Sequence, residues 1–101
     1  MAILVHPARA TRHWIPAGVL RGDRMYHVLS DLPGAEGTRE LTAFVVPYGL
    51  RPAWIQYPGT YREHFDVRPE TGERMIADGV RLATNREVGL LLRAKREAMS
   101  Y

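Results

Sequence analysis

Two histidine–aspartate pairs are the residues of this sequence best suited to chemistry. His64 and Asp66 stand at alternate positions, so on an extended segment both would point to one side and Phe65 to the other. His27 and Asp31 are four residues apart. That spacing makes them neighbours on a helix, or separates them by about 13 Å on one face of a strand. A histidine beside a carboxylate suits a general base, a phosphate ligand or part of a metal site.

Structural roles account for the same residues. Asp66 stands three residues before Pro69 and could cap a helix that begins there, with His64 as a hydrogen-bonded neighbour. His27 could be a buried, hydrogen-bonded histidine, and Asp31 a turn residue. A divalent metal held by His27, His64 and Asp66 is a further option, for zinc or a harder cation. No tightly spaced metal-binding motif is present, so the sequence leaves these interpretations open.

The composition limits the classes of protein to consider. The chain has 101 residues, of which 46% are hydrophobic and 25% charged. These values predict one globular domain over residues 1–101. The sequence contains no cysteine, which excludes disulfides, thiolate metal ligands and a cysteine nucleophile. No apolar run is long enough to cross a bilayer, and the first residues lack the features of a signal peptide. We therefore expect a cytoplasmic protein that does not associate with membranes.

The charge is basic and unevenly distributed. The chain has fourteen basic and eleven acidic residues, and Lys95 is its only lysine. The preference for arginine fits either the codon usage of a GC-rich genome or recognition of phosphate and carboxylate groups. Residues 1–24 and 81–101 are net positive, whereas residues 25–80 are net negative. The two basic ends favour an acidic partner.

Hydrophobic patterning predicts alternating strands and helices. We expect strands at residues 3–5, 25–29, 53–56 and 80–83, with Trp54 in the core. We expect helices from an N-cap at Thr38 to about Val46, from Pro69 to Asp78, and from Asn85 to Ala98, the last burying Leu91 and Leu92. Thr84 and Glu87 match a capping box. Residues 7–24 are expected to form a long irregular loop. The predicted fold is α/β, a small mostly parallel sheet of three to four strands flanked by three helices.

Ligands of such sheets usually bind at the carboxyl ends of the strands. His6, Asp31, Gln56 and Thr84 all lie at or just past the end of a predicted strand. Together with the residues before the second helix, this position predicts one polar pocket, whose candidate ligand-binding residues are His27, Asp31, Gln56, His64, Asp66 and Arg74. Histidines and an arginine favour a small anionic ligand, nucleotide-like in character.

Most of these polar residues belong to a set of segments that resembles a known family. The segments are Tyr26–Asp31, Glu40–Phe44, Tyr48–Arg51, Trp54–Gln56, His64–Val67 and Ala77–Val80. This ordered set resembles the family catalogued as domain of unknown function 4031, small proteins of bacteria and their phages. The resemblance covers most of the chain and implies no reaction. The family pattern differs at three places: it has an aspartate at position 6, a helix former at position 47 and a Lys-Arg pair at positions 73–74.

The sequence is compatible with two functions. The first is a ligand pocket, with or without enzymatic activity, for which a divalent metal is a possible cofactor. The second is a non-enzymatic module that binds nucleic acid or an acidic protein surface through the arginine-rich ends, with salt-sensitive affinity. The recurring histidines and aspartates favour the pocket, because phosphate contacts alone require no such residues. The oligomeric state stays undetermined.

Overall fold

The computed structural model describes residues 2–9 and 23–100. Within them the element order is β1 (Ile3–Arg9), β2 (Arg24–Ser30), α1 (Gly34–Val45), the 3-10 turns η1 (Val46–Tyr48) and η2 (Pro52–Trp54), β3 (Phe65–Val67), α2 (Pro69–Ala77), β4 (Arg81–Leu82) and α3 (Asn85–Ala98). The fold is α/β, with three helices around a four-stranded sheet of order β3-β2-β1-β4.

The sheet is mixed and mostly antiparallel, so the prediction of a mostly parallel sheet was wrong. β2 pairs antiparallel with both β1 and β3, and only the short β4 runs parallel to β1. Residues 53–56 do not form the predicted strand. Pro52 starts a 3-10 turn that ends at Trp54, and Trp54 is 39% exposed instead of in the core. Phe65–Val67, which we expected to be only an extended lead into α2, forms the strand instead.

Both ends of the predicted loop at residues 7–24 belong to strands instead. β1 continues through Pro7 to Arg9, and β2 begins at Arg24; residues 10–22 lie outside the described part of the chain. Proline lacks the N–H that a central strand position would need. β4 pairs only with Leu4 and Val5, so among the described residues no strand pairs with Pro7 on that edge of β1, and a proline fits there.

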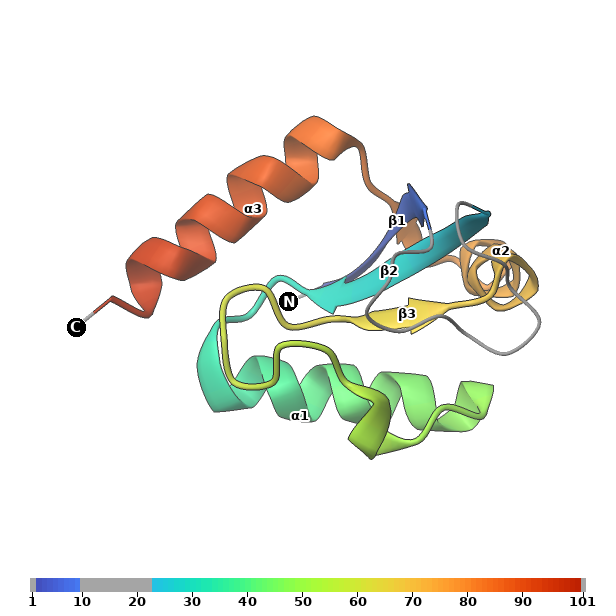
Figure 1. Cartoon of the computed structure of the whole chain (residues 1–101), viewed down its shortest axis with the longest axis horizontal. Coiled ribbons are helices and arrows are strands. Elements are labelled where there is room, and N and C mark those ends of the chain that lie inside the picture. Colours follow the sequence, from blue (N-terminus) through green and yellow to red (C-terminus); the bar gives the residue numbers. More distant parts are fainter. Residues whose placement is uncertain (1, 10–22, 101) are drawn as a thin grey trace.

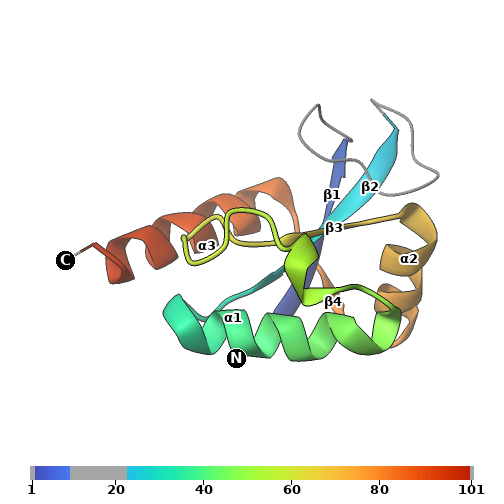
Figure 2. The same cartoon turned by 60° about the horizontal axis from the view of Figure 1, so that its bottom comes forward.

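Two helical layers enclose the sheet (Figures 1 and 2). α1 and α2 pack on one face, where the buried side chains of Val5, Tyr26, Val28, Leu41, Val45, Phe65, Val67 and Met75 form the main core. α3 packs on the other face through a smaller cluster of Leu4, Leu29, Ala83 and Val88. Among the described residues, no helix is long and apolar enough to cross a membrane.

The helix ends follow local sequence signals. α1 begins at Gly34, so the predicted N-cap Thr38 lies inside the helix, where its hydroxyl lies at hydrogen-bond distance from the Gly34 carbonyl and the Glu63 carboxylate. Pro69 starts α2, as predicted. α3 has the predicted bounds and the predicted capping box between Thr84 and Glu87.

Burial along α3 differs from the prediction. Leu91 and Leu92 are only partly buried, while Val88 and Lys95 are the residues of this helix that are buried. α3 rests on a sheet of few strands. Its central leucines pack against the small cluster and stay partly exposed.

Candidate metal centre

One row of polar side chains crosses the sheet on the α3 face. The register places His6 of β1 opposite His27 of β2, and His27 opposite Asp66 of β3. Directly paired residues of neighbouring strands point to the same face, so all three share it. His64 stands just before β3, two residues from Asp66, and joins the row from the same side.

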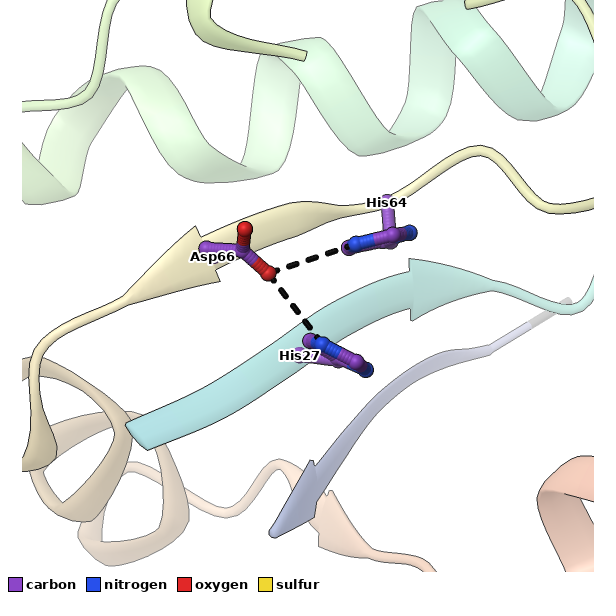
Figure 3. Close-up of side chains that lie close together, drawn as sticks. All are labelled: His27, His64 and Asp66. Carbon is purple, nitrogen blue, oxygen red and sulfur yellow. Dashed lines mark ion pairs between the residues drawn. The ribbon is translucent and has the colours of Figure 1, made fainter. Parts of the chain in front are cut away.

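Three of these side chains converge on one point (Figure 3). The Asp66 Oδ1 lies 3.2 Å from the His27 Nε2 and 3.2 Å from the His64 Nε2. The ligand atoms of the three residues all lie within 4.8 Å of one another. The sequence proposed this set as a metal site, and the sheet register brings it together from segments nearly forty residues apart in the chain.

The tautomer of His64 is set by its neighbour. Its Nδ1 lies 2.7 Å from the backbone carbonyl oxygen of Arg62. A carbonyl oxygen can only accept, so Nδ1 donates, and the Nε2 of the neutral ring presents a lone pair to Asp66. Metal-binding histidines commonly show this arrangement, in which the second ring nitrogen donates to a backbone carbonyl.

Asp66 lacks the hydrogen bonds that its burial requires. Its side chain is 6% exposed. Its Oδ1 has no hydrogen-bond partner among the described residues, although both Nε2 atoms are at ion-pair distance. A buried carboxylate oxygen without a donor is costly. A cation bound by this oxygen together with the two Nε2 atoms would satisfy it.

The electrostatics favour a neutral His27. The pKa of His27 is lowered to about 4, chiefly by burial and also by the neighbouring His64 and His6, whereas Asp66 opposes the shift. At neutral pH the ring is therefore uncharged, which is the form that binds metal ions.

Of the remaining predicted residues, Gln56 lies beside the converging set, whereas Asp31 and Arg74 lie elsewhere. Asp31 follows β2 and accepts a hydrogen bond from the Ala2 backbone N–H through Oδ1. Gln56 forms a backbone bridge with His64, while its side-chain amide donates to the Trp54 carbonyl. Arg74 belongs to α2, on the opposite face of the sheet, and its guanidinium lies over the Tyr48 ring.

A family model described as Protein of unknown function (DUF4031) matches residues 12–95 of the chain. The chain belongs to this family. The match spans every residue of the converging set, His27, His64 and Asp66. No curated protein and no solved structure matched the chain.

Some neighbours of the site carried no sequence signal for this role. Tyr57 lies with its ring centre 6.0 Å from that of His64 and is 39% exposed. Its φ of 51° is unusual for a bulky residue. The Arg62 guanidinium lies 4.3 Å from the Tyr57 ring centre, and Asn85 contacts His6. A tyrosine in a Pro-Gly loop and an asparagine after a helix cap are common surface residues. Only their position in the structure identifies them as neighbours of the site.

Proposed function

We propose that this protein binds a divalent transition-metal ion through His27, His64 and Asp66, and that the ion in turn holds a small anionic ligand. The observation that carries the proposal is the buried Asp66 Oδ1, which has no hydrogen-bond partner while it faces the two Nε2 atoms at 3.2 Å. Ligand atoms about 2.0–2.2 Å from one ion lie roughly 3.0–3.5 Å from one another. The 3.2 Å separations fit that spacing.

The set of ligands indicates the class of metal. Two imidazoles and one carboxylate suit zinc or a ferrous-type ion, and the hard cations magnesium and calcium prefer all-oxygen sites. Three protein ligands leave open positions on the ion. Two neutral imidazoles and one carboxylate leave a net positive charge on a divalent ion, which favours an anion at those positions.

The surroundings support an anionic ligand. Because the Arg62 guanidinium carbon lies 4.3 Å from the Tyr57 ring centre, and that centre 6.0 Å from the His64 ring, the guanidinium lies within about 10 Å of His64. Arg62 forms no ion pair in the part of the chain that the structure describes. An arginine held against an aromatic ring is suited to a phosphate or carboxylate group. A nucleoside phosphate could use both Arg62 and the exposed Tyr57 ring.

Metal binding is tested on protein stripped with a chelator. Zn²⁺, Mn²⁺, Co²⁺, Ni²⁺, Mg²⁺ and anaerobic Fe²⁺ are added in turn, and binding is followed by melting temperature and calorimetry. An ion at 100 times its Kd would stabilise the fold by about 2.7 kcal/mol. For a chain of this size that raises the melting temperature by about 10–20 °C.

The matched variants are Asp66→Asn and Asp78→Asn. Asp78 accepts a hydrogen bond from the Tyr48 hydroxyl on the other side of the molecule, so Asp78→Asn should keep the metal response. Asp66→Asn and His64→Ala should lose it. The melting temperature of metal-free His64→Ala should stay unchanged or rise, because binding sites often trade stability for function. The proposal fails if no ion binds the wild type, or if Asp66→Asn binds as well as the wild type.

A second candidate function is non-specific binding of nucleic acid. Arg86 and Arg93 are exposed and seven residues apart, so they lie on one side of α3. We expect gel shifts that weaken steeply with salt and show little sequence preference. Replacing both arginines with alanine should weaken the shift. Absence of binding at low salt, with single- and double-stranded probes, would exclude this function.

A further inference from the structure

We propose that His6 selects the ligand of the metal centre by accepting a hydrogen bond at Nδ1, so that the site prefers anions that carry an O–H group. The inference rests on the proposed metal site. It assigns a role to a residue outside the three ligands and names the chemical class of molecule that they would hold.

The first observation is the place of His6 in the row. Its ring centre lies 6.0 Å from that of His27, on the side away from Asp66. The converging set does not include His6, so its nitrogens are too far from the other ligand atoms to share one ion directly with them. A ligand atom bound to the ion lies about 2.1 Å from the metal, and an acceptor of its hydrogen bond lies about 2.8 Å from that atom. A molecule that occupies an open position of the ion and extends past the His27 ring would therefore meet His6.

The second observation is the state of the ring. The His6 Nε2 lies 2.5 Å from the Asn85 Oδ1, at the first residue of α3. This amide oxygen can only accept, so Nε2 carries the proton, and Nδ1 of the neutral ring is an acceptor. Asn85 therefore sets the tautomer of His6 as the Arg62 carbonyl sets that of His64.

The third observation joins His6 to Asp66. Two buried side-chain polar atoms in the described part of the chain lack a hydrogen-bond partner: the His6 Nδ1 and the Asp66 Oδ1. They flank His27 in one row of the sheet. Unsatisfied buried groups are rare in folded proteins and call for an explanation such as a missing ion or ligand. The ion would satisfy Asp66, and a donor bound to that ion would satisfy His6.

The consequence is a preference between anions of similar shape. Hydrogencarbonate and formate both offer an oxygen to the ion, but only hydrogencarbonate has an O–H to donate. Loss of one hydrogen bond of this kind weakens binding by about tenfold. An anion without a donor would leave the His6 Nδ1 unsatisfied and would bind less tightly.

The experiment uses the whole chain loaded with Co²⁺, whose visible absorption reports binding of anions to the ion. Formate and hydrogencarbonate are titrated separately at one pH. His6→Ala should weaken hydrogencarbonate by about tenfold and change formate less than about twofold. The affinity for Co²⁺ itself should not change.

Variants at the start of α3 separate this role from general damage. Asn85→Ala removes the acceptor at Nε2, so it should reduce the preference for hydrogencarbonate, whereas Asn85→Asp should keep it. Thr84→Ala removes the helix cap without touching His6, and should lower stability but preserve the preference. If His6→Ala does not fold, the variants at Asn85 still test whether His6 accepts the hydrogen bond.

Several outcomes would overturn the inference. If His6→Ala weakens the binding of both anions equally, or leaves the preference for hydrogencarbonate unchanged, His6 does not recognise the O–H group. Loss of Co²⁺ by His6→Ala would make His6 a metal ligand instead. Failure of the wild type to bind any metal would refute the proposed function itself, and the inference with it.

Discussion

Asp66 lies directly across the sheet from His27, with its Oδ1 3.2 Å from the His27 Nε2. A carboxylate at this distance would ordinarily favour the protonated histidine. Here burial is the larger effect, and the pKa of His27 falls to about 4. The contact therefore pairs a buried carboxylate with a neutral ring.

The stability of the metal-free protein should fall as the pH drops from about 6.5 to about 4. The pKa of His27 is near 6.5 in the unfolded chain and about 4 in the fold, so the unfolded state binds more protons within that range. His27→Gln removes this titration. Melting temperatures at pH 7 and pH 5, measured with a chelator present, should fall further for the wild type than for the variant. Parallel decreases would contradict the low pKa.

Gly72→Ala should destabilise the protein by about 1–3 kcal/mol. A Cβ at Gly72 would overlap the ring of Tyr26, so α2 could no longer approach β2 as closely. Gly89→Ala is the matched control: it also lies within a helix, but has open space around the new methyl group. Gly89→Ala should stabilise by about 0.5–1 kcal/mol. Urea unfolding of both variants checks the pair, and equal effects would contradict the close contact between α2 and β2.

Leu41→Ala should cost more than Leu91→Ala. Leu41 is fully buried between α1 and the sheet, and truncations at such positions cost about 2–5 kcal/mol. Leu91 packs only partly against the smaller cluster, so we expect a loss of about 1 kcal/mol. Denaturant midpoints of the two variants give the comparison. A larger loss at Leu91 would show that the α3 face carries more of the stability than its burial indicates.

Lys95→Ala should destabilise the protein by about 1–3 kcal/mol. Lys95 is 4% exposed and its Nζ donates a 2.8 Å hydrogen bond to the Ser30 carbonyl, which ties α3 to the end of β2. Burial lowers its pKa, while Glu63 and Asp31 oppose the shift. Lys95→Met keeps most of the side-chain volume and isolates the loss of the hydrogen bond. Arg93→Ala, on the exposed side of α3, should change the free energy of unfolding by less than about 0.5 kcal/mol.

Lys95 also shows what periodicity could have revealed. It stands four residues after Leu91 and seven after Val88, so it belongs to the apolar stripe of α3. A lysine in the last turns of a helix is more commonly a surface charge that balances the helix dipole. The chain resolves this conflict with the Ser30 carbonyl, an acceptor from a distant strand that no local pattern can indicate.

The sequence by itself determined the features that depend on neighbours in the chain. Pro69 starts α2 and the Thr84 capping box starts α3, because each acts on backbone groups within one helical turn. The alternation of His64 and Asp66 predicted that both would share a face. The family resemblance is likewise a property of ordered local motifs, and the family model confirms it.

Only the tertiary structure decided the direction and register of the strands. Pairing β2 with β1 and β3 in antiparallel fashion sets His6, His27 and Asp66 in one row, and a shift of one residue would turn His27 to the opposite face. The same register leaves Asp31 just beyond the end of β2, near Ala2. Register follows from the burial of Val5, Val28 and Phe65 against α1 and α2. That packing energy comes from the whole core, which is why local sequence patterns could propose the three metal-site residues but could not place them together.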